Sequence, residues 1–230
     1  MIQFNRVFKR YPEGKDALSD VSFDIGAGEM VFLTGHSGAG KSTVLKLIMQ
    51  MERATTGEVI VAGRNLNRMR RSRIPQHRRQ IGVVFQNHQL LFDRNVFENV
   101  ALPLQIAGFQ SAEVGRRVRA ALSKVGLGGM ERQAPITLSG GEQQRVGIAR
   151  AIVNKPPIVL ADEPTGNLDP ALSSEIMALF EQFTELGVTM LIASHDHALI
   201  RRMDKRVIAL QSGSTVFDGV LSEYADQHHR

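Results

Sequence analysis

The fold is decided by residues 35–43, which read Gly35-His36-Ser37-Gly38-Ala39-Gly40-Lys41-Ser42-Thr43. An apolar run, residues 30–34, precedes this stretch, and a helical pattern, residues 44–48, follows it. Strand, glycine-rich loop and helix are the setting in which G-x-x-x-x-G-K-S binds phosphate. Glycines let the backbone turn successive N–H groups toward phosphate oxygens, and the helix N-terminus adds its positive end. The sequence therefore predicts a nucleotide-binding α/β protein.

The polar residues of this loop have expected partners on ATP. Lys41 is expected to reach the β- and γ-phosphates, which makes it a candidate catalytic residue as well as a binding residue. The Ser42 hydroxyl is a Mg²⁺ ligand in this motif, and Thr43 is placed to approach the α-phosphate. The whole stretch is a candidate site for ATP and Mg²⁺.

Length and composition favour one domain. At 230 residues and 43% hydrophobic content, the chain can bury a single substantial core over residues 1–230. No apolar run approaches the roughly 18 to 20 residues that cross a bilayer, and the start lacks the apolar segment of a secretory signal. We therefore expect a cytoplasmic protein. The absence of cysteine excludes disulfides, thiolate zinc sites and cysteine nucleophiles.

Short apolar runs bounded by turns predict buried strands of a largely parallel sheet, at residues 30–34, 81–85, 158–161, 188–193 and 207–210. Alternating patterns at 21–25 and 58–61 predict a flanking antiparallel sheet. Between about 87 and 156 helical patterns replace strands, for example at 113–125. We expect an α/β core of about 1–88 and 157–230 with an inserted helical subdomain of about 89–156.

A carboxylate pair follows the predicted strand 158–161. Neighbouring residues at a strand end point in different directions, so Asp162 and Glu163 can serve different tasks. Asp162 fits a Mg²⁺ shell, and Glu163 fits the group that orients and deprotonates the attacking water. By itself an Asp-Glu pair is more often the acidic start of a helix, but the phosphate loop favours the catalytic interpretation.

A second loop with anion-binding features precedes the helical stretch that ends at Ile152. Its serine hydroxyl and glycine N–H groups stand at a helix start, in the residues Ser139, Gly140, Gly141 and Glu142. A subunit with one phosphate loop binds one Mg²⁺-nucleotide, and that nucleotide does not need a second anion-binding loop in the same subunit. The pattern indicates a phosphate supplied from elsewhere.

Together these motifs resemble the nucleotide-binding domains of ABC ATPases over nearly the whole chain. In that family the signature segment, here Leu138-Ser139-Gly140-Gly141-Glu142, closes over the γ-phosphate of ATP on the opposite subunit. The resemblance implies a P-loop ABC fold and a head-to-tail homodimer that encloses two ATP. Glu142 stands where glutamine is commonest, a frequent variant that leaves Ser139 and Gly141 in place.

The same resemblance assigns further residues. Tyr11 resembles the aromatic that stacks on adenine, although an ordinary surface tyrosine is the alternative. Gln86 resembles the Q-loop glutamine, with catalytic and Mg²⁺-binding roles, and His195 the switch histidine that holds the γ-phosphate and water in line. Asp169 closes the D-loop sequence Asn167-Leu168-Asp169.

At finer grain, residues 34–43, 90–94 and 145–156 resemble the ATP-binding subunits of bacterial cell-division complexes of this family. That resemblance implies an integral membrane partner docking on residues 87–100, a place at the cytoplasmic face of the inner membrane, and activation of septal cell-wall hydrolases. ATPases of lipoprotein-release or macrolide-type exporters are the alternative.

The net charge of +5 is concentrated in residues 64–79, where seven arginines lie within sixteen residues. Nucleic acid, anionic lipid headgroups and an acidic partner are possible ligands, while a solvated polar face is the more ordinary interpretation. A nucleic-acid-associated ABC ATPase is disfavoured, because the coiled-coil or zinc-bearing insertions of such proteins are missing. No direct nucleic-acid partner is expected.

Overall fold

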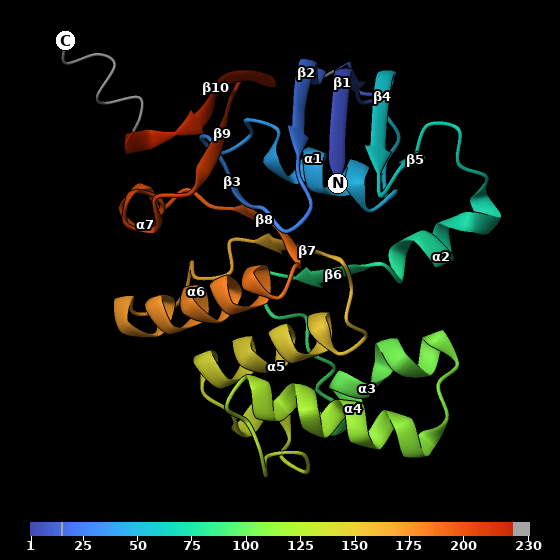
Figure 1. Ribbon diagram of the computed structural model, residues 1–230, viewed down its shortest axis with the longest axis vertical. Coiled ribbons are helices and arrows are strands. Elements are labelled where there is room, and N and C mark those ends of the chain that lie inside the picture. Colours follow the sequence, from blue (N-terminus) through green and yellow to red (C-terminus); the bar gives the residue numbers. More distant parts are fainter. Residues whose placement is uncertain (15, 223–230) are drawn as a thin grey trace. The chain divides into compact units, whose positions relative to one another are not determined.

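The computed structural model describes residues 1–14 and 16–222 and contains two compact units (Figure 1). Unit 1 comprises Met1–Arg78 and the chain from Thr189 onward, and unit 2 comprises Arg79–Val188. Residues 224–230, to which the sequence assigns no role, lie outside the described residues. The subdomain boundaries expected at about 88 and 157 remain a prediction.

One sheet of unit 1 is antiparallel. It contains β1 (Ile2–Arg10), β2 (Asp16–Ile25), β4 (Thr56–Val61) and β5 (Arg64–Asn65), in the order β2-β1-β4-β5. Inward side chains alternate with outward ones, and the rings of Phe4 and Phe23 stack with their centroids 4.5 Å apart. The expected flanking antiparallel sheet is confirmed, with β1 as a central strand that the sequence analysis did not identify.

The other sheet of unit 1 carries the buried strands. It contains β3 (Met30–Thr34), β8 (Thr189–Ala193), β9 (Arg206–Gln211) and β10 (Ser214–Val220). Strand β3 runs parallel to both β8 and β9, and β10 pairs antiparallel with β9. Every residue of β3 and β8 is buried, as expected for strands covered on both faces. This parallel core confirms the predicted α/β class.

Helices of unit 1 include α1 (Lys41–Ile48), the short turn η1 (Arg71–Arg73), α2 (Ile74–Arg78) and α7 (His197–Met203). The C-terminal end of α1 is held by side chains of α2. The buried His77 bonds through Nε2 to the Ile48 carbonyl oxygen at 2.7 Å, and the Arg78 guanidinium donates to the carbonyls of Met49 and Gln50. Donors at a helix C-terminus satisfy its unpaired carbonyls, so α1 is anchored at the end remote from the phosphate loop.

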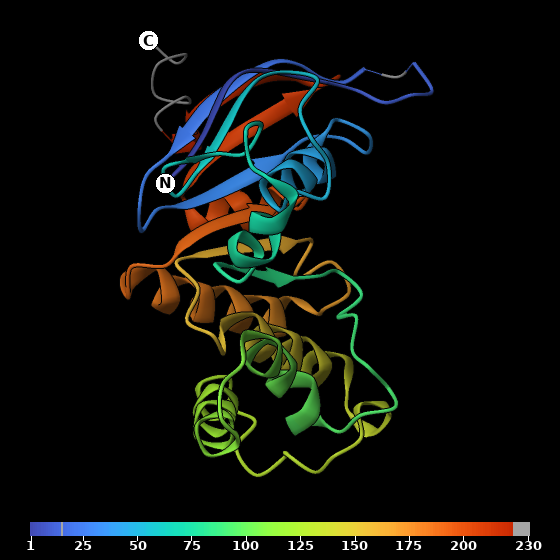
Figure 2. The same ribbon diagram turned by 90° about the vertical axis from the view of Figure 1, so that its right-hand side faces the viewer.

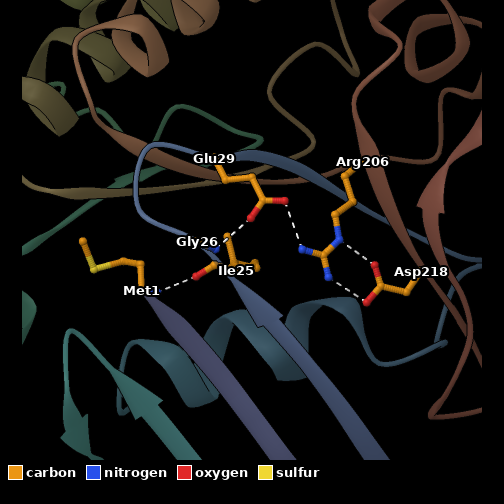
Figure 3. Close-up of polar contacts among 6 residues, drawn as sticks. All are labelled: Met1, Ile25, Gly26, Glu29, Arg206 and Asp218. Atoms are coloured by element: carbon orange, nitrogen blue, oxygen red, sulfur yellow. Dashed lines mark hydrogen bonds and ion pairs between the residues drawn. The ribbon is translucent and has the colours of Figure 1, made fainter.

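A polar network ties the start of β3 to β9 and β10 (Figure 3). The Glu29 carboxylate accepts from the Gly26 N–H at 2.7 Å and from Arg206 Nη1 at 3.0 Å. Arg206 also donates to both carboxylate oxygens of Asp218, at 2.6 and 2.8 Å. The bonds to Asp218 raise the pKa of the Arg206 guanidinium, although burial opposes them. The network fixes the outer strands of the sheet on the strand that leads into the phosphate loop.

Unit 2 places two strands beside a group of helices. Strands β6 (Ile81–Val84) and β7 (Ile158–Asp162) pair in parallel. The helical elements are α3 (Val96–Ala107), α4 (Ser111–Lys124), η2 (Pro135–Thr137), α5 (Gly140–Ile152) and α6 (Pro170–Glu185). Helices α3, α4 and α5 pack against one another, and Figure 2 shows them from a second side. A Cβ on Gly82 would lie 2.4 Å from the Ala151 carbonyl oxygen, so glycine allows α5 to approach β6 closely. Among the described residues, no helix has the length and apolar character needed to cross a bilayer.

Candidate nucleotide site and signature loop

The phosphate loop depends on two glycines that no other residue could replace without movement. Gly35 has φ 144°, and a Cβ there would lie 2.2 Å from the Leu210 carbonyl oxygen. Gly40 has φ 113°, and its Cβ would lie 2.8 Å from the Ala17 carbonyl oxygen. The loop backbone therefore adopts a conformation, and fits a space, that only glycine supplies at these positions.

This loop leaves the N-terminus of α1 open. Gly40 is the N-cap residue, and within the described part of the chain no side chain caps the first turn. Lys41 folds back, with Nζ donating to the Gly35 carbonyl at 2.6 Å and to that of His36 at 3.3 Å. Ser42 is exposed, whereas Thr43 is buried. Uncapped N–H groups beside a lysine form a ready anion site, because the helix dipole and the ammonium attract the same negative charge.

His195 lies next to the phosphate loop by strand order. Strands β3 and β8 are parallel neighbours, with Leu33 paired to Ala193. Residues two positions beyond these partners, Gly35 and His195, therefore leave the sheet at the same edge, where ligands of parallel sheets bind. His195 is exposed, and the following Asp196 caps α7 by accepting from the Leu199 N–H at 2.9 Å.

Tyr11 follows β1 and is half buried. The Lys9 ammonium stands 4.8 Å from its ring centroid, in a cation–π contact. Lys9 is itself 8% exposed and is held by the Glu52 carboxylate at 2.7 Å and the Arg53 carbonyl at 3.0 Å. Lys9 fixes the ring from one face, and no motif in the sequence marks it for that role.

Unit 2 groups the glutamine and the carboxylates in the same way. Parallel β6 and β7 end side by side, with Val84 paired to Ala161, so Gln86 and Glu163 both follow the carboxyl edge. Gln86 is exposed, and its Nε2 lies 3.7 Å from the position that a Cβ on Gly166 would take. The Glu163 carbonyl accepts from the Gly166 N–H at 3.2 Å.

Glu163 has a left-handed backbone, with φ 49°. Such a conformation is uncommon for a residue with a side chain and is concentrated at functional sites. Asp162, the last residue of β7, is half buried. The expected Mg²⁺ donors are a carboxylate, a hydroxyl and an amide oxygen, on Asp162, Ser42 and Gln86. These hard oxygen donors suit Mg²⁺, which commonly takes one or two carboxylates together with substrate phosphates.

The signature loop is closed by its own side chains. Ser139 is the N-cap of α5, its Oγ accepts from the Glu142 N–H at 3.3 Å, and Glu142 Oε2 accepts from both the Ser139 N–H and hydroxyl at 2.8 Å. These bonds lower the pKa of the Glu142 carboxyl. The Ser139 N–H and hydroxyl are therefore occupied by an internal carboxylate. Gly140 is exposed, and a Cβ on Gly141 would meet the Leu172 side chain at 2.2 Å.

A buried network that the sequence analysis missed connects three motifs of unit 2. Gln144, on α5, is 1% exposed; it donates to the Pro164 carbonyl at 2.7 Å and bonds through Oε1 to His88 Nδ1. Arg150 donates to the carbonyls of His88 and Gln89, both of which have positive φ. The signature helix is thus bonded to the segment after Gln86 and to the loop after Glu163. A buried glutamine in a helix carries no sequence pattern that marks it as a link.

Asp169 caps α6. Its Oδ1 accepts from the N–H groups of Ala171 and Leu172 at 2.9 and 3.0 Å. Capping alone explains an aspartate at this place, so its role toward nucleotide remains a prediction.

Comparison with known proteins agrees with this arrangement. Residues 18–166 match the family described as ABC transporter. The chain belongs to that family and is an ABC-type ATPase subunit.

Its relatives include a particular member. The cell division ATP-binding protein FtsE of Escherichia coli K12 is 55% identical over 213 residues, 93% of this chain and 96% of that protein. FtsE of Bacillus subtilis is 46% identical over 224 residues, 97% of this chain and 98% of that protein. The chain is thus an ATPase subunit of the cell-division type.

Solved structures show the same fold. The cassette MJ0796, solved as a dimer bound to ADP and Pi, gives a TM-score of 0.87 at 36% identity and covers 96% of this chain and 99% of its own. The protein cbiO1 of Clostridium perfringens, part of the transporter complex cbiONQ, gives a TM-score of 0.90 at 28% identity, covering 99% of this chain and 91% of its own. The predicted ABC fold is confirmed.

Proposed function

We propose that this chain uses ATP to send a conformational signal through an integral, FtsX-like membrane subunit during cell division, leading to activation of septal cell-wall hydrolases. It acts at the cytoplasmic face of the inner membrane, held there by that subunit. The observation that carries the use of ATP is the N-terminus of α1. It follows the glycine-containing phosphate loop, and no described side chain caps it, so it can bind phosphate. The identity to FtsE proteins directs the proposal to division and away from lipoprotein release or macrolide export.

The residues divide the work on ATP. Tyr11 stacks on adenine, the N–H groups of residues 35–43 and Lys41 hold the phosphates, and His195 keeps the γ-phosphate and water in line. Ser42, Asp162 and Gln86 would hold Mg²⁺, which would supply charge neutralisation of the phosphates. Glu163 orients the attacking water and accepts its proton. The left-handed backbone at Glu163 supports this role.

Two copies enclose two ATP. One phosphate loop and one signature loop per chain require a head-to-tail pair, in which Ser139 and Gly141 of one subunit meet the γ-phosphate on the other. Asp169 lies at the start of α6 and belongs to the same contact. The dimeric MJ0796 cassette supports this arrangement.

The segment after Gln86 receives the membrane subunit. Phe92 is 58% exposed, whereas Leu90 beside it is 6% exposed. The segment is held in shape by the buried Asn99, whose amide donates to the carbonyls of Leu91, Arg94 and Asn95 and accepts from the Leu91 N–H. A rigid loop that presents a large apolar side chain suits a helix of a partner.

The test compares Glu163→Gln with Glu185→Gln, an exposed carboxylate on α6. Glu163→Gln is expected to bind ATP, lose about 100-fold or more of its phosphate release and accumulate a dimer in size-exclusion chromatography. Glu185→Gln is expected to match wild type in all three. Equal turnover in both variants would remove Glu163 as the base.

Purification of the Glu163→Gln protein from detergent-solubilised membranes of its own cell tests the partner. Co-purification of one division-type membrane subunit, dependent on ATP, is expected. Capture of lipoprotein-release or efflux subunits would contradict the division role while leaving the ATPase assignment intact.

A further inference from the structure

The structure separates the arginines of residues 64–79 into different groups. Arg78 donates to the carbonyls at the end of α1, and Arg79 donates to the Ile106 carbonyl at 2.9 Å. These two guanidiniums have a structural use. Arg71 is exposed on η1.

The others surround a hollow of about 420 Å³ in unit 1, lined by Arg64, Arg68, Arg70, Arg73, Asn65 and Gln76. We call this hollow the arginine pocket. Among the residues that the structure describes, no carboxylate lines it. Arg68 reaches Glu58 only at 3.8 Å, with its side chain 83% exposed, and Arg73 donates to Gln76 at 3.2 Å. Among the described residues, Glu58 is thus the only carboxylate within 4.0 Å of any of the four guanidiniums, so the pocket has an excess of positive charge that a bound anion would offset.

The backbone that carries these arginines is fixed. Leu66 is fully buried and Met69 is 9% exposed, so both anchor the segment in the core. The Met69 carbonyl accepts from Arg53 at 2.9 Å, and Asn65 Oδ1 accepts from the Asn67 N–H at 3.0 Å. A solvated charge run needs no such anchoring, whereas a binding site gains affinity from it.

The chemistry of the lining residues selects the ligand. Guanidinium groups present planar forks of donors that match phosphate oxygens in pairs. The Gln76 amide nitrogen adds a neutral donor, whereas the Asn65 amide already donates to Glu58 at 2.9 Å. The hollow is large enough for a phosphate group with a small polar substituent. Met69 also lines the hollow, with its side chain largely buried.

We propose that the arginine pocket binds a phosphate group, supplied by the headgroup of an acidic phospholipid at the membrane surface. This contact goes beyond the proposed function, because it needs no membrane subunit and no ATP. It would orient the ATPase on the membrane from a second point. A soluble phosphate compound has the same chemistry and is the other source.

The test measures co-sedimentation of the purified chain with vesicles of phosphatidylglycerol and phosphatidylcholine, against pure phosphatidylcholine. The pocket variant is Arg70→Gln/Arg73→Gln. The control variant Arg71→Gln/Arg132→Gln removes the same net charge from exposed positions outside the lining. The pocket variant is expected to bind acidic vesicles at least about tenfold more weakly than wild type, and the control within about threefold.

Pyrophosphate separates the two sources. All three proteins are tested in a Lys41→Ala background, in which the phosphate loop is expected not to bind. If pyrophosphate raises the melting temperature of the parent and the control but not of the pocket variant, while vesicles bind none of them, a soluble phosphate compound fills the pocket. Equal weakening in both variants would overturn the proposal in favour of a solvated face. Pocket-dependent retention of a short RNA without binding of vesicles or pyrophosphate would also overturn it. Phosphate release by the pocket and control variants that keep Lys41, expected to match wild type, keeps this result separate from the ATPase assignment.

Discussion

The phosphate loop and the signature loop share one arrangement, a loop that leads into a helix N-terminus, but they differ in whether a side chain caps that end. Each ends in a helix whose first N–H groups face an anion site. At α1 the N-cap is Gly40 and within the described chain no side chain covers the end, whereas at α5 Ser139 and Glu142 bond to each other across it. One site is open to its own ATP. At the other, the Glu142 carboxylate accepts from the Ser139 N–H and hydroxyl, and we expect these bonds to open when a phosphate from a second subunit binds.

The far parts of the two helices differ as well. Helix α1 is anchored at its C-terminus by His77 and Arg78, so the loading site stands on a fixed support. Helix α5 is bonded through Gln144 and Arg150 to the segment after Gln86 and to the loop after Glu163. From this difference we expect α1 to hold nucleotide in place, and a movement of α5 to be transmitted to the two segments bonded to it.

The largest expected effect comes from removing the positive charge of Lys41 from the phosphate loop. Lys41→Ala should lower phosphate release by about 1,000-fold and abolish binding of a fluorescent ATP analogue, because we expect the ammonium to contact the β- and γ-phosphates. Lys46→Ala, on the exposed face of the same helix, is the control and should bind normally. Normal binding by Lys41→Ala would contradict the phosphate-loop assignment.

The next largest effect is expected from substituting two glycines of the phosphate loop that have positive φ. Gly35→Ala should lower the free energy of unfolding by about 3 kcal/mol and weaken ATP binding, because the new Cβ meets the Leu210 carbonyl. Gly38→Ala, where φ is 79° and nothing described lies within 4 Å, should cost only about 1 kcal/mol. Chemical denaturation gives both values. Equal losses would show that the close approach to Leu210 is unimportant.

A smaller effect concerns the internal carboxylate of the signature loop. Glu142→Gln preserves the capping box, since glutamine also bonds the N-cap N–H, but removes the negative charge. In a Glu163→Gln background it should tighten ATP-dependent dimerisation about two- to fivefold, measured by sedimentation equilibrium. Weaker dimerisation would mean that the carboxylate aids phosphate binding.

The smallest effect is a pH dependence at the anchored end of α1. Burial, followed by the charges of Arg64 and Arg78, lowers the pKa of His77 from its usual 6.5, while the bond to Ile48 opposes this. Below about pH 6.5 His77 is protonated in the unfolded chain but stays neutral in the folded chain. The free energy of unfolding therefore falls as pH falls. His77→Gln does not titrate and should show a smaller loss between about pH 7 and about pH 5.5 in urea denaturation. An unchanged slope would contradict the neutral buried histidine.

Sequence patterns identified the strands that are buried on both faces, because a short, continuous apolar run between turns is typical of such strands. The runs at 30–34, 158–161 and 207–210 correspond to β3, β7 and β9. Strands β1 and β10 were missed. Their exposed polar positions, such as Gln3 and Asp218, interrupt the apolar pattern, and only pairing with neighbours makes them strands.

By itself the sequence determined the class of this protein, since glycines, a lysine and carboxylates at set spacings serve a chemistry that needs those residue types in that order. Tertiary structure decided what each motif touches. Contacts of Lys9 with Tyr11 and of Gln144 with His88 follow from packing, whereas the capping box of Ser139 and Glu142 is local and is written in the sequence. It also gathered the arginines around one hollow, because a run of charges has no fixed direction until buried neighbours such as Leu66 fix its backbone.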